Sequence, residues 1–234
     1  MRIVLPGGSG QVGQLLSRHF AEQGHDVVVL SRSGTAAAGR ALAWDGKTIG
    51  AWAQAIDGAD VVVNLAGRSV NCRYTEANLR EMMDSRVDST RVVGEAIAAA
   101  ERPPAVWLQM STATIYAHRF DAANDEEIGI IGGSEPDVPA YWSRSIDIAK
   151  RWEETLNAAD TPRTRRVALR AAMVMSPDRG GIFDVLLGMV RRGLGGTAGS
   201  GEQYVSWIHD HDFKAAIDHL IAHDVAGPVN LASP

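Results

Sequence analysis

Three glycines follow one another at intervals of three residues near the start of the chain, at Gly7, Gly10 and Gly13. An apolar run at 3–5 precedes them, and a helical pattern at 12–23 follows. Glycines at this spacing allow a tight turn from a strand into a helix, whose free N–H groups and dipole favour a phosphate. An ordinary glycine turn is the alternative, which the flanking strand and helix disfavour. The loop therefore predicts a dinucleotide pyrophosphate site formed by Gly7, Ser9, Gly10, Gln11, Val12 and Gly13.

The residues after the second apolar run, 27–30, distinguish between dinucleotides. A carboxylate there would accept hydrogen bonds from the ribose 2′-hydroxyl of NAD. This chain has Ser31, Arg32 and Ser33 instead. The Arg32 guanidinium suits a 2′-phosphate, and the two serine hydroxyls can donate to it. The sequence thus favours NADP(H) over NAD(H), with a solvated surface arginine as the alternative; Asp45, further along, is a candidate for contact with the adenine.

Short apolar runs rich in β-branched residues alternate with amphipathic stretches along the chain. Strands are predicted at 3–5, 27–30, 41–44, 61–65, 105–110, 166–170 and 228–231. Helices are predicted at 12–23, 49–56, 75–100, 145–159, 182–192 and 210–223. Apolar runs without polar alternation are typical of a parallel sheet covered on both faces. The predicted fold class is therefore α/β, a Rossmann-type doubly wound parallel sheet with right-handed crossovers.

The pattern changes near residue 175, and we expect two parts of a single integrated domain. Residues 1–174 form the dinucleotide-binding core. Residues 175–234 supply a small C-terminal substrate cap together with the last helix and strand of the core. Within this part, the glycine-rich segment 193–201 is expected to be either a mobile lid or a long surface loop.

Composition excludes several classes of protein. The chain has 234 residues, 45% of them apolar, which is enough for one large core. With 23 basic and 28 acidic residues its net charge is −5, which argues against non-specific nucleic-acid binding. No apolar run is long enough to span a membrane, and the N-terminus begins with a strand rather than a signal peptide. Because Cys72 is the single cysteine, we expect no internal disulfide and a cytoplasmic setting.

The run His209-Asp210-His211-Asp212 contains residue types that ligate metals. Adjacent side chains diverge, however, and no third cluster supports them. We therefore predict no metal site, and interpret Asp210 as the cap of the helix that begins there.

Motifs after the fourth and fifth strands carry a family resemblance. Asn64-Leu65-Ala66-Gly67-Arg68 and Ser111-Thr112-Ala113-Thr114-Ile115-Tyr116, with the glycine loop, resemble the extended and atypical short-chain dehydrogenases of the NAD-dependent epimerase/dehydratase superfamily. Nearly the whole chain is similar to a poorly characterised "epimerase family" branch, through 73–75, 85–91, 169–170, 180–181 and 205–210. That branch usually continues past the segment like 227–234, so we expect part of its substrate wall to lie outside this sequence.

The resemblance implies an oxidoreductase or epimerase acting on a hydroxyl or carbonyl substrate, such as a nucleotide-linked sugar. It implies a homodimer through the two long helices at 75–100 and 145–159. The basic pair Arg68 and Arg73 indicates an anionic ligand. Further cofactor contacts are implied for Leu65, Ala66, Gly67, Arg68 and Arg86.

In relatives that oxidise a hydroxyl, a Ser or Thr orients the substrate, and a Tyr with a Lys four residues later transfers the proton. Thr112 takes the first place, with Ser111 beside it. Tyr141 is a candidate for the second, but position 145 is Ser. Lys150 follows nine residues later, roughly 900° of helix rotation, and so faces the opposite side.

The other candidate proton donors are Tyr116 and His118. The missing Tyr-x-x-x-Lys pair leaves an alternative open, a non-catalytic NADP(H)-binding sensor or scaffold.

Overall fold

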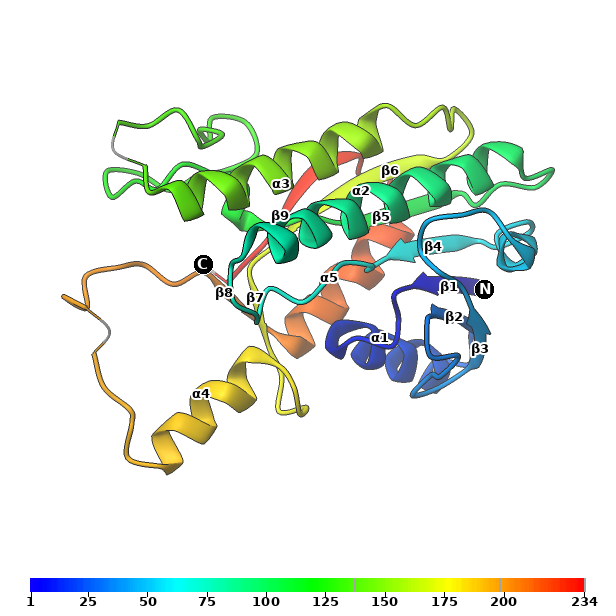
Figure 1. Cartoon of the computed structure of the whole chain (residues 1–234). Coiled ribbons are helices and arrows are strands. Elements are labelled where there is room, and N and C mark those ends of the chain that lie inside the picture. Colours follow the sequence, from blue (N-terminus) through cyan, green and yellow to red (C-terminus); the bar gives the residue numbers. More distant parts are fainter. Residues whose placement is uncertain (137, 198, 234) are drawn as a thin grey trace.

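The structure is a computed structural model that describes residues 1–136, 138–197 and 199–233. In these ranges seven parallel strands form one sheet in the order β3-β2-β1-β4-β5-β6-β9 (Figure 1). Each overlaps one of the seven predicted apolar runs. The predicted Rossmann-type sheet is therefore confirmed, with strands β1 (Arg2–Pro6), β2 (Asp26–Ser31), β3 (Arg40–Ala43), β4 (Val61–Asn64), β5 (Val106–Met110), β6 (Arg165–Ala171) and β9 (Gly227–Leu231).

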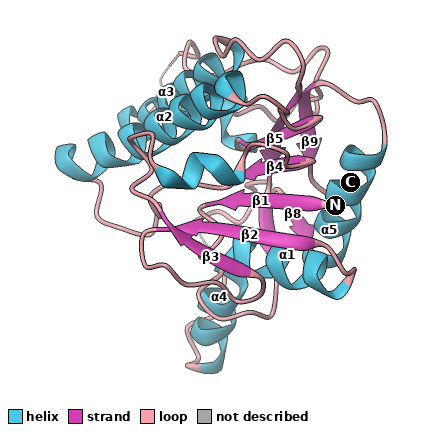
Figure 2. Cartoon of the chain, turned by 90° about the vertical axis from the view of Figure 1, so that its right-hand side faces the viewer, coloured by secondary structure: helices cyan, strands magenta, loops and turns pink. Residues whose placement is uncertain are grey.

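Helices cover both faces of this sheet (Figures 1 and 2). Helices α1 (Gln11–Glu22) and α5 (Asp210–Ala222) pack on one face, in a core cluster that includes Ile3 and Leu5. Helices α2 (Glu76–Ala99) and α3 (Ala140–Asn157) cover the other, where Val4 points. Because successive strand side chains alternate, a strand buried on both faces must be apolar throughout.

The sheet order places the expected ligand site. Strand β1 lies between β2 and β4. The chain therefore continues from β1 to β2 and β3 on one side, and then crosses over to β4 and β5 on the other side. In open α/β sheets ligands bind at the carboxyl ends of the strands next to such a switch point. The glycine loop, the residues after β2 and the loop after β4 all lie there, and the loop after β5 follows on the neighbouring strand.

Several local features differ from the sequence predictions. Helix α3 begins at Ala140, five residues earlier than predicted, directly after Pro139. The stretch 49–56 forms only the 3-10 helix η1 (Ala51–Ala55), and a second 3-10 helix, η2, spans Ala113–Ile115. Strands β7 (Met173–Met175) and β8 (Trp207–His209) were not predicted; they pair in a separate parallel sheet, and three residues are too few to show a period.

The segment expected to form the cap extends outward. Its helix α4 (Ile182–Arg191) projects from the body in Figure 1, and no side chain of it is buried. Position 198, within the predicted lid 193–201, lies outside the described residues. Among the helices described, none combines the length and hydropathy needed to cross a membrane.

Candidate functional site

The glycine loop is shaped by close backbone contacts on two sides. Gly7 has a φ of +76°, and a Cβ there would lie 2.6 Å from Ala66 Cα. A Cβ on Gly13 would lie 2.4 Å from Gly8 Cα. At Gly10 the nearest atom would be 3.6 Å away, an ordinary contact. The protein's own packing thus requires glycine at 7 and 13, whereas at 10 the absent side chain leaves room for a ligand.

Helix α1 begins at this opening without a side-chain cap. Gly10 is its N-cap residue, and no side chain accepts a hydrogen bond from the first turn. The first N–H groups of a helix need partners, and a phosphate suits them by geometry and by the helix dipole. Gln11, at the first position, lies against Gly181, 3.1 Å from Nε2 to the site of a Cβ. The start of α4 therefore flanks the glycine loop.

At the end of β2, the hydroxyls of Ser31 and Ser33 already form hydrogen bonds within the chain, whereas the Arg32 side chain is exposed. The Ser31 hydroxyl is buried; it accepts from Thr35 N–H at 3.0 Å and lies 3.1 Å from the Thr35 carbonyl, to which it donates. The Ser33 and Thr35 hydroxyls are 2.6 Å apart. These bonds hold the turn, so the serine contacts predicted for a 2′-phosphate stay a prediction. Arg32 is exposed, and in the described part of the chain no carboxylate pairs with it.

Asp45 also serves a local turn. Its carboxylate accepts from the Thr48 hydroxyl at 2.6 Å and from the N–H groups of Lys47 and Thr48 at 2.8 and 2.9 Å. The Thr48 hydroxyl, then these N–H groups, lower the pKa of Asp45 to about 2. A carboxylate with these partners has less left to offer a ligand, and its predicted adenine contact stays a prediction.

The loop after β4 is fixed beside the glycine loop. Leu65 N–H donates to the Pro6 carbonyl at 2.8 Å, and Ala66 N–H donates to Asn64 Oδ1 at 3.1 Å. Asn64 is buried and donates through its amide to Gln109 on β5 at 2.9 Å. The predicted cofactor residues Leu65, Ala66 and Gly67 thus lie next to Gly7, held from three strands.

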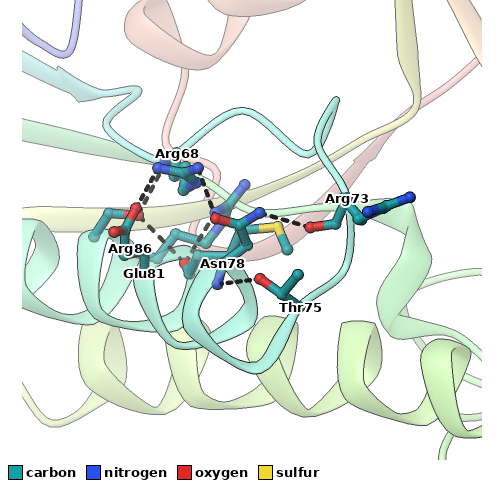
Figure 3. Close-up of polar contacts among 8 residues, drawn as sticks. Arg68, Arg73, Thr75, Asn78, Glu81 and Arg86 are labelled. Atoms are coloured by element: carbon teal, nitrogen blue, oxygen red, sulfur yellow. Dashed lines mark hydrogen bonds and ion pairs between the residues drawn. The ribbon is translucent and has the colours of Figure 1, made fainter.

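Two arginines lie near each other at this loop, Arg68 in the loop itself and Arg86 on α2 (Figure 3). Arg68 forms an ion pair with Glu81 and donates to Asn78 Oδ1 at 2.9 Å. Arg86 donates to the Met82 carbonyl at 2.9 Å, and its guanidinium carbon lies 4.9 Å from the centre of the Trp152 ring. Burial lowers the pKa of Arg86 to about 10, so the group remains charged at neutral pH.

Thr112 follows β5 and is the N-cap of η2. Its hydroxyl accepts from Thr114 N–H at 3.2 Å and donates to the Thr114 hydroxyl at 3.0 Å. Thr112 therefore caps η2 through its side chain. Both partners lie two residues away, so the hydroxyl stays at the carboxyl end of β5, where a substrate oxygen would approach.

Ser111 and Tyr116, the other two hydroxyls of this motif, belong to a buried network. Ser111 donates to Glu153 at 2.6 Å, and Arg170 binds both Glu153 oxygens at 2.8 and 3.0 Å. Arg170 also donates to the Tyr116 hydroxyl at 2.8 Å, which in turn donates to Asn230 at 2.9 Å. These bonds give Ser111 and Tyr116 a structural role, and the catalytic role expected for them stays a prediction.

The remaining candidates for proton transfer lie on α3 and in the loop after η2. Tyr141 is in its first turn and is 64% exposed. Lys150 lies on the same helix with its Nζ 3.4 Å from the site of a Gly133 Cβ, and no Lys occupies position 145. His118 is exposed and packs edge-on against Phe120, with ring centres 5.0 Å apart. No Tyr–Lys couple of the expected spacing forms on this helix.

Comparison with known proteins identifies the family. A sequence model of the "NAD dependent epimerase/dehydratase family" matches residues 3–232. The chain belongs to this family. It is 31% identical over 240 residues to human "Epimerase family protein SDR39U1" and 27% identical over 242 residues to "Epimerase family protein YfhF" of Bacillus subtilis. In both cases the match covers all of this chain and 75% of the relative, and the predicted resemblance is confirmed.

Solved structures of the epimerase family share the fold. The crystal structure of human SDR39U1 (isoform2) with NADPH has a TM-score of 0.84 at 28% identity, covering all of this chain and 75% of that one. A nucleoside-diphosphate sugar epimerase from Corynebacterium glutamicum has a TM-score of 0.79 at 24% identity, covering all of this chain and 46% of that one. The latter likeness shows the fold alone.

Within this family member, sequence reasoning missed the two groups that complete the buried network. Glu153 lies on α3 in register with the buried residues Ile146, Ala149 and Leu156. A carboxylate on an apolar stripe needs a buried partner, and that mismatch was the available signal. Asn230, at the opposite edge of the network, gave no such signal.

The start of α5, the helix after β8, differs from the sequence prediction. His209, rather than Asp210, is the N-cap of α5, and its Nδ1 accepts from His211 N–H at 3.1 Å. The helix begins one residue earlier than an Asp210 cap requires, so Asp210 lies in its first turn, where the dipole favours a carboxylate. Among the described residues, no group of three or more His, Cys, Asp or Glu side chains is arranged to hold a metal.

Proposed function

We propose that this chain binds NADP(H) and acts as an oxidoreductase or epimerase on a hydroxyl or carbonyl substrate. The observation that carries the proposal is the uncapped start of α1 at Gly10, with Arg32 exposed and unpaired among the described residues at the end of β2. An uncapped helix start suits the pyrophosphate, and a free guanidinium suits a 2′-phosphate. The 28% identical human relative, crystallised with NADPH, supports the same cofactor.

The substrate side of the proposal rests on Thr112 and on the surrounding charges. Thr112 would orient a substrate oxygen from the end of β5. Arg73, exposed on the loop before α2, would attract an anionic substrate such as a nucleotide-linked sugar. The proposal also includes a cytoplasmic setting, supported by the lone Cys72, and a homodimer through α2 and α3.

A specific observation favours a second function, a non-catalytic NADP(H)-binding sensor or scaffold. The Ser111 and Tyr116 hydroxyls are held in the buried network, and no Lys follows Tyr141 at the usual spacing. This function needs the cofactor site but no proton donor.

Two measurements distinguish these functions. Titration with NADPH and NADH, followed by fluorescence, tests the cofactor; binding of neither would refute both proposals. A panel of aldehydes, ketones and nucleotide-linked sugars then tests the reaction. NADPH consumption reports reduction, and proton NMR of the sugar reports epimerisation, which consumes no net cofactor. Sustained turnover would exclude the non-catalytic function, whereas tight binding without turnover would support it.

Variants of Thr112 test its role in any turnover. Thr112→Val should lower kcat/KM at least about tenfold with little change in NADPH affinity. Thr112→Ser keeps the hydroxyl and the η2 cap, so most of the activity should return. Equal activity of Thr112→Val and wild type would remove Thr112 from the mechanism.

A further inference from the structure

Four aromatic side chains from three segments of the chain lie next to one another. His118 and Phe120 follow η2, Trp142 is in the first turn of α3, and Tyr204 lies three residues before β8. The ring centres of His118 and Phe120 are 5.0 Å apart, those of His118 and Trp142 are 6.2 Å apart, and those of Phe120 and Tyr204 are 5.9 Å apart. These distances are typical of aromatic pairs. We call the four residues the aromatic row.

The aromatic row is largely uncovered. Phe120 is 59% exposed, and Tyr204 is 77% exposed. His118 is exposed as well, and Trp142 is half-buried. The indole N–H of Trp142 is buried and has no hydrogen-bond acceptor among the residues described, although a buried indole normally has one. Adjacent exposed apolar side chains typically mark a surface that binds a ligand or a partner.

Hydrogen bonds anchor the loop after η2, which carries two of these rings, to the core. The Asn124 amide donates to the Ala117 carbonyl at 3.0 Å, and the Asn124 side-chain oxygen accepts from Ile130 N–H at 3.1 Å. From β9, the Asn230 amide donates to the Asn124 carbonyl at 3.2 Å. Side chains that are held in place before a ligand arrives lose less entropy on binding, which favours affinity.

The aromatic row borders the substrate side of the candidate site. His118 is six residues from Thr112, which follows β5, and Trp142 is next to Tyr141. In Figure 1 the loop after η2 (green) and the segment before β8 (orange) lie on the same side of the molecule as the start of α3. Short stretches of chain thus connect Thr112 and Tyr141 to the row. A ring bound there would lie beside the place proposed for the reacting oxygen.

The charges around the row disfavour phosphate. Residues 118–135 contain five acidic side chains and one basic side chain, Arg119. Arg119 donates to both carboxylate oxygens of Asp121, at 2.7 and 2.9 Å, so its charge is already balanced. A further carboxylate, Glu202, lies two residues before Tyr204. This excess of negative charge would repel a phosphate but not an uncharged ring.

We propose that the aromatic row binds an aromatic ring of the substrate that carries no phosphate, by stacking against Phe120 and Tyr204. This inference rests on the proposed function, and it narrows the substrate to a hydroxyl or carbonyl compound with an aromatic group. Arg73 lies on a different loop, before α2, so a negative charge elsewhere on the same substrate is compatible with the row. The base of a nucleotide-linked sugar, by contrast, would bring its diphosphate close to the acidic loop.

NMR titration with a matched pair of alcohols tests the proposal. Naphthalen-2-ylmethanol has an aromatic ring system, and decahydronaphthalen-2-ylmethanol has the same carbon skeleton without one. Wild type should bind the aromatic alcohol at least about threefold more tightly than the saturated one. Phe120→Leu and Tyr204→Leu keep an apolar side chain. Each should raise the Kd of the aromatic alcohol by about 3- to 10-fold and leave that of the saturated alcohol within about twofold.

Two further variants control for the lost apolar surface and for the fold. Ile128→Ala is the matched control, because Ile128 is on the same loop, is 74% exposed and lies outside the row. It should leave the Kd of the aromatic alcohol within about twofold. Phe120→Tyr keeps the ring and should bind like wild type. If Phe120→Leu does not fold, Tyr204→Leu tests the same contact from another segment.

The outcomes are distinct. Equal binding of the two alcohols by wild type, or no binding of either, would overturn the proposal. Wild-type affinity of either folded leucine variant for the aromatic alcohol would do the same. UDP, titrated in parallel, carries a ring together with a diphosphate; weaker binding of UDP by the leucine variants would show that the row accepts a nucleotide, and would overturn the proposed substrate class. Failure of the proposed function is seen separately, as wild-type protein that binds neither NADPH nor NADH, because the alcohols are titrated without cofactor.

Discussion

Replacing Arg32 with alanine should convert this protein from an NADPH-preferring to an unselective dinucleotide binder. Arg32 directly follows β2 and is exposed, and within the described ranges it has no carboxylate partner to release. Ser31 cannot compensate, because it is 1% exposed and bonded to Thr35 through both its donor and its acceptor positions. We therefore expect the charged recognition of a 2′-phosphate to depend mainly on Arg32.

The expected size of the effect follows from this exposure. A hydrogen bond to a charged group contributes about 1.5–3 kcal/mol net, whereas exposed ion pairs contribute only about 0–1 kcal/mol. A bidentate guanidinium–phosphate contact is stronger than a simple surface pair. We expect about 1.5–2 kcal/mol for Arg32, which corresponds to an increase of about 10- to 30-fold in the Kd for NADPH. The Kd for NADH should change less than about twofold.

Fluorescence titration of wild type and Arg32→Ala with both cofactors, at one fixed salt concentration, measures this difference. Arg151→Ala is the matched control: Arg151 is exposed on α3 and forms a local ion pair with Glu154 at 3.2 Å. Equal weakening of NADPH and NADH would show that Arg32 stabilises the loop and does not read the phosphate. Unchanged NADPH affinity would show that the phosphate lies elsewhere. Either result would refute the assignment.

Two further predictions concern the packing of the site. Gly10→Ala should keep the wild-type melting temperature but lose NADPH affinity, because its methyl group would make only an ordinary contact within the protein and would occupy the space proposed for the ligand. Gly13→Ala should melt at a lower temperature, because its Cβ would lie 2.4 Å from Gly8 Cα; we expect its free energy of unfolding to fall by about 1–3 kcal/mol. Arg170→Met should lower the free energy of unfolding, measured in urea, by about 3–5 kcal/mol, since it leaves the buried Glu153 carboxylate without its counter-charge, and the added change Glu153→Leu should recover part of that loss. A Gly10→Ala that loses as much stability as Gly13→Ala, or an Arg170→Met as stable as wild type, would contradict these readings.

The central fold was predictable because its signal is local and repeated. The central strands of the sheet are apolar runs such as Val27 to Leu30, whose side chains are buried on both faces. The features that were not predictable depend on few residues or on distant ones. Strand β8 has three residues and pairs with β7, more than thirty positions earlier in the chain. Helix α3 begins after Pro139, before its apolar stripe starts, so periodicity alone placed its first turn too late.

The same distinction between local and distant residues applies to the candidate site. The glycine loop could be predicted because its residues are consecutive and its shape follows from glycine itself. The buried network could not, because its members come from separate elements: Ser111 and Glu153 are 42 positions apart, and Tyr116 and Asn230 are 114 apart. Only the fold brings such groups together, and a single sequence shows each of them merely as a polar residue.

That network in turn restricts where proton transfer can occur. Tyr116 is bonded to both Arg170 and Asn230, so using its proton would break a contact that joins β6 to β9. The Thr112 hydroxyl, by contrast, is bonded to Thr114, two residues away, and Tyr141 is exposed at the start of α3. We therefore expect any proton transfer in this protein to use Thr112, an exposed group such as Tyr141 or His118, or the ligand itself. The loops that we propose for the cofactor are held by close backbone contacts, whereas Tyr141, a predicted proton donor, is exposed at the start of α3.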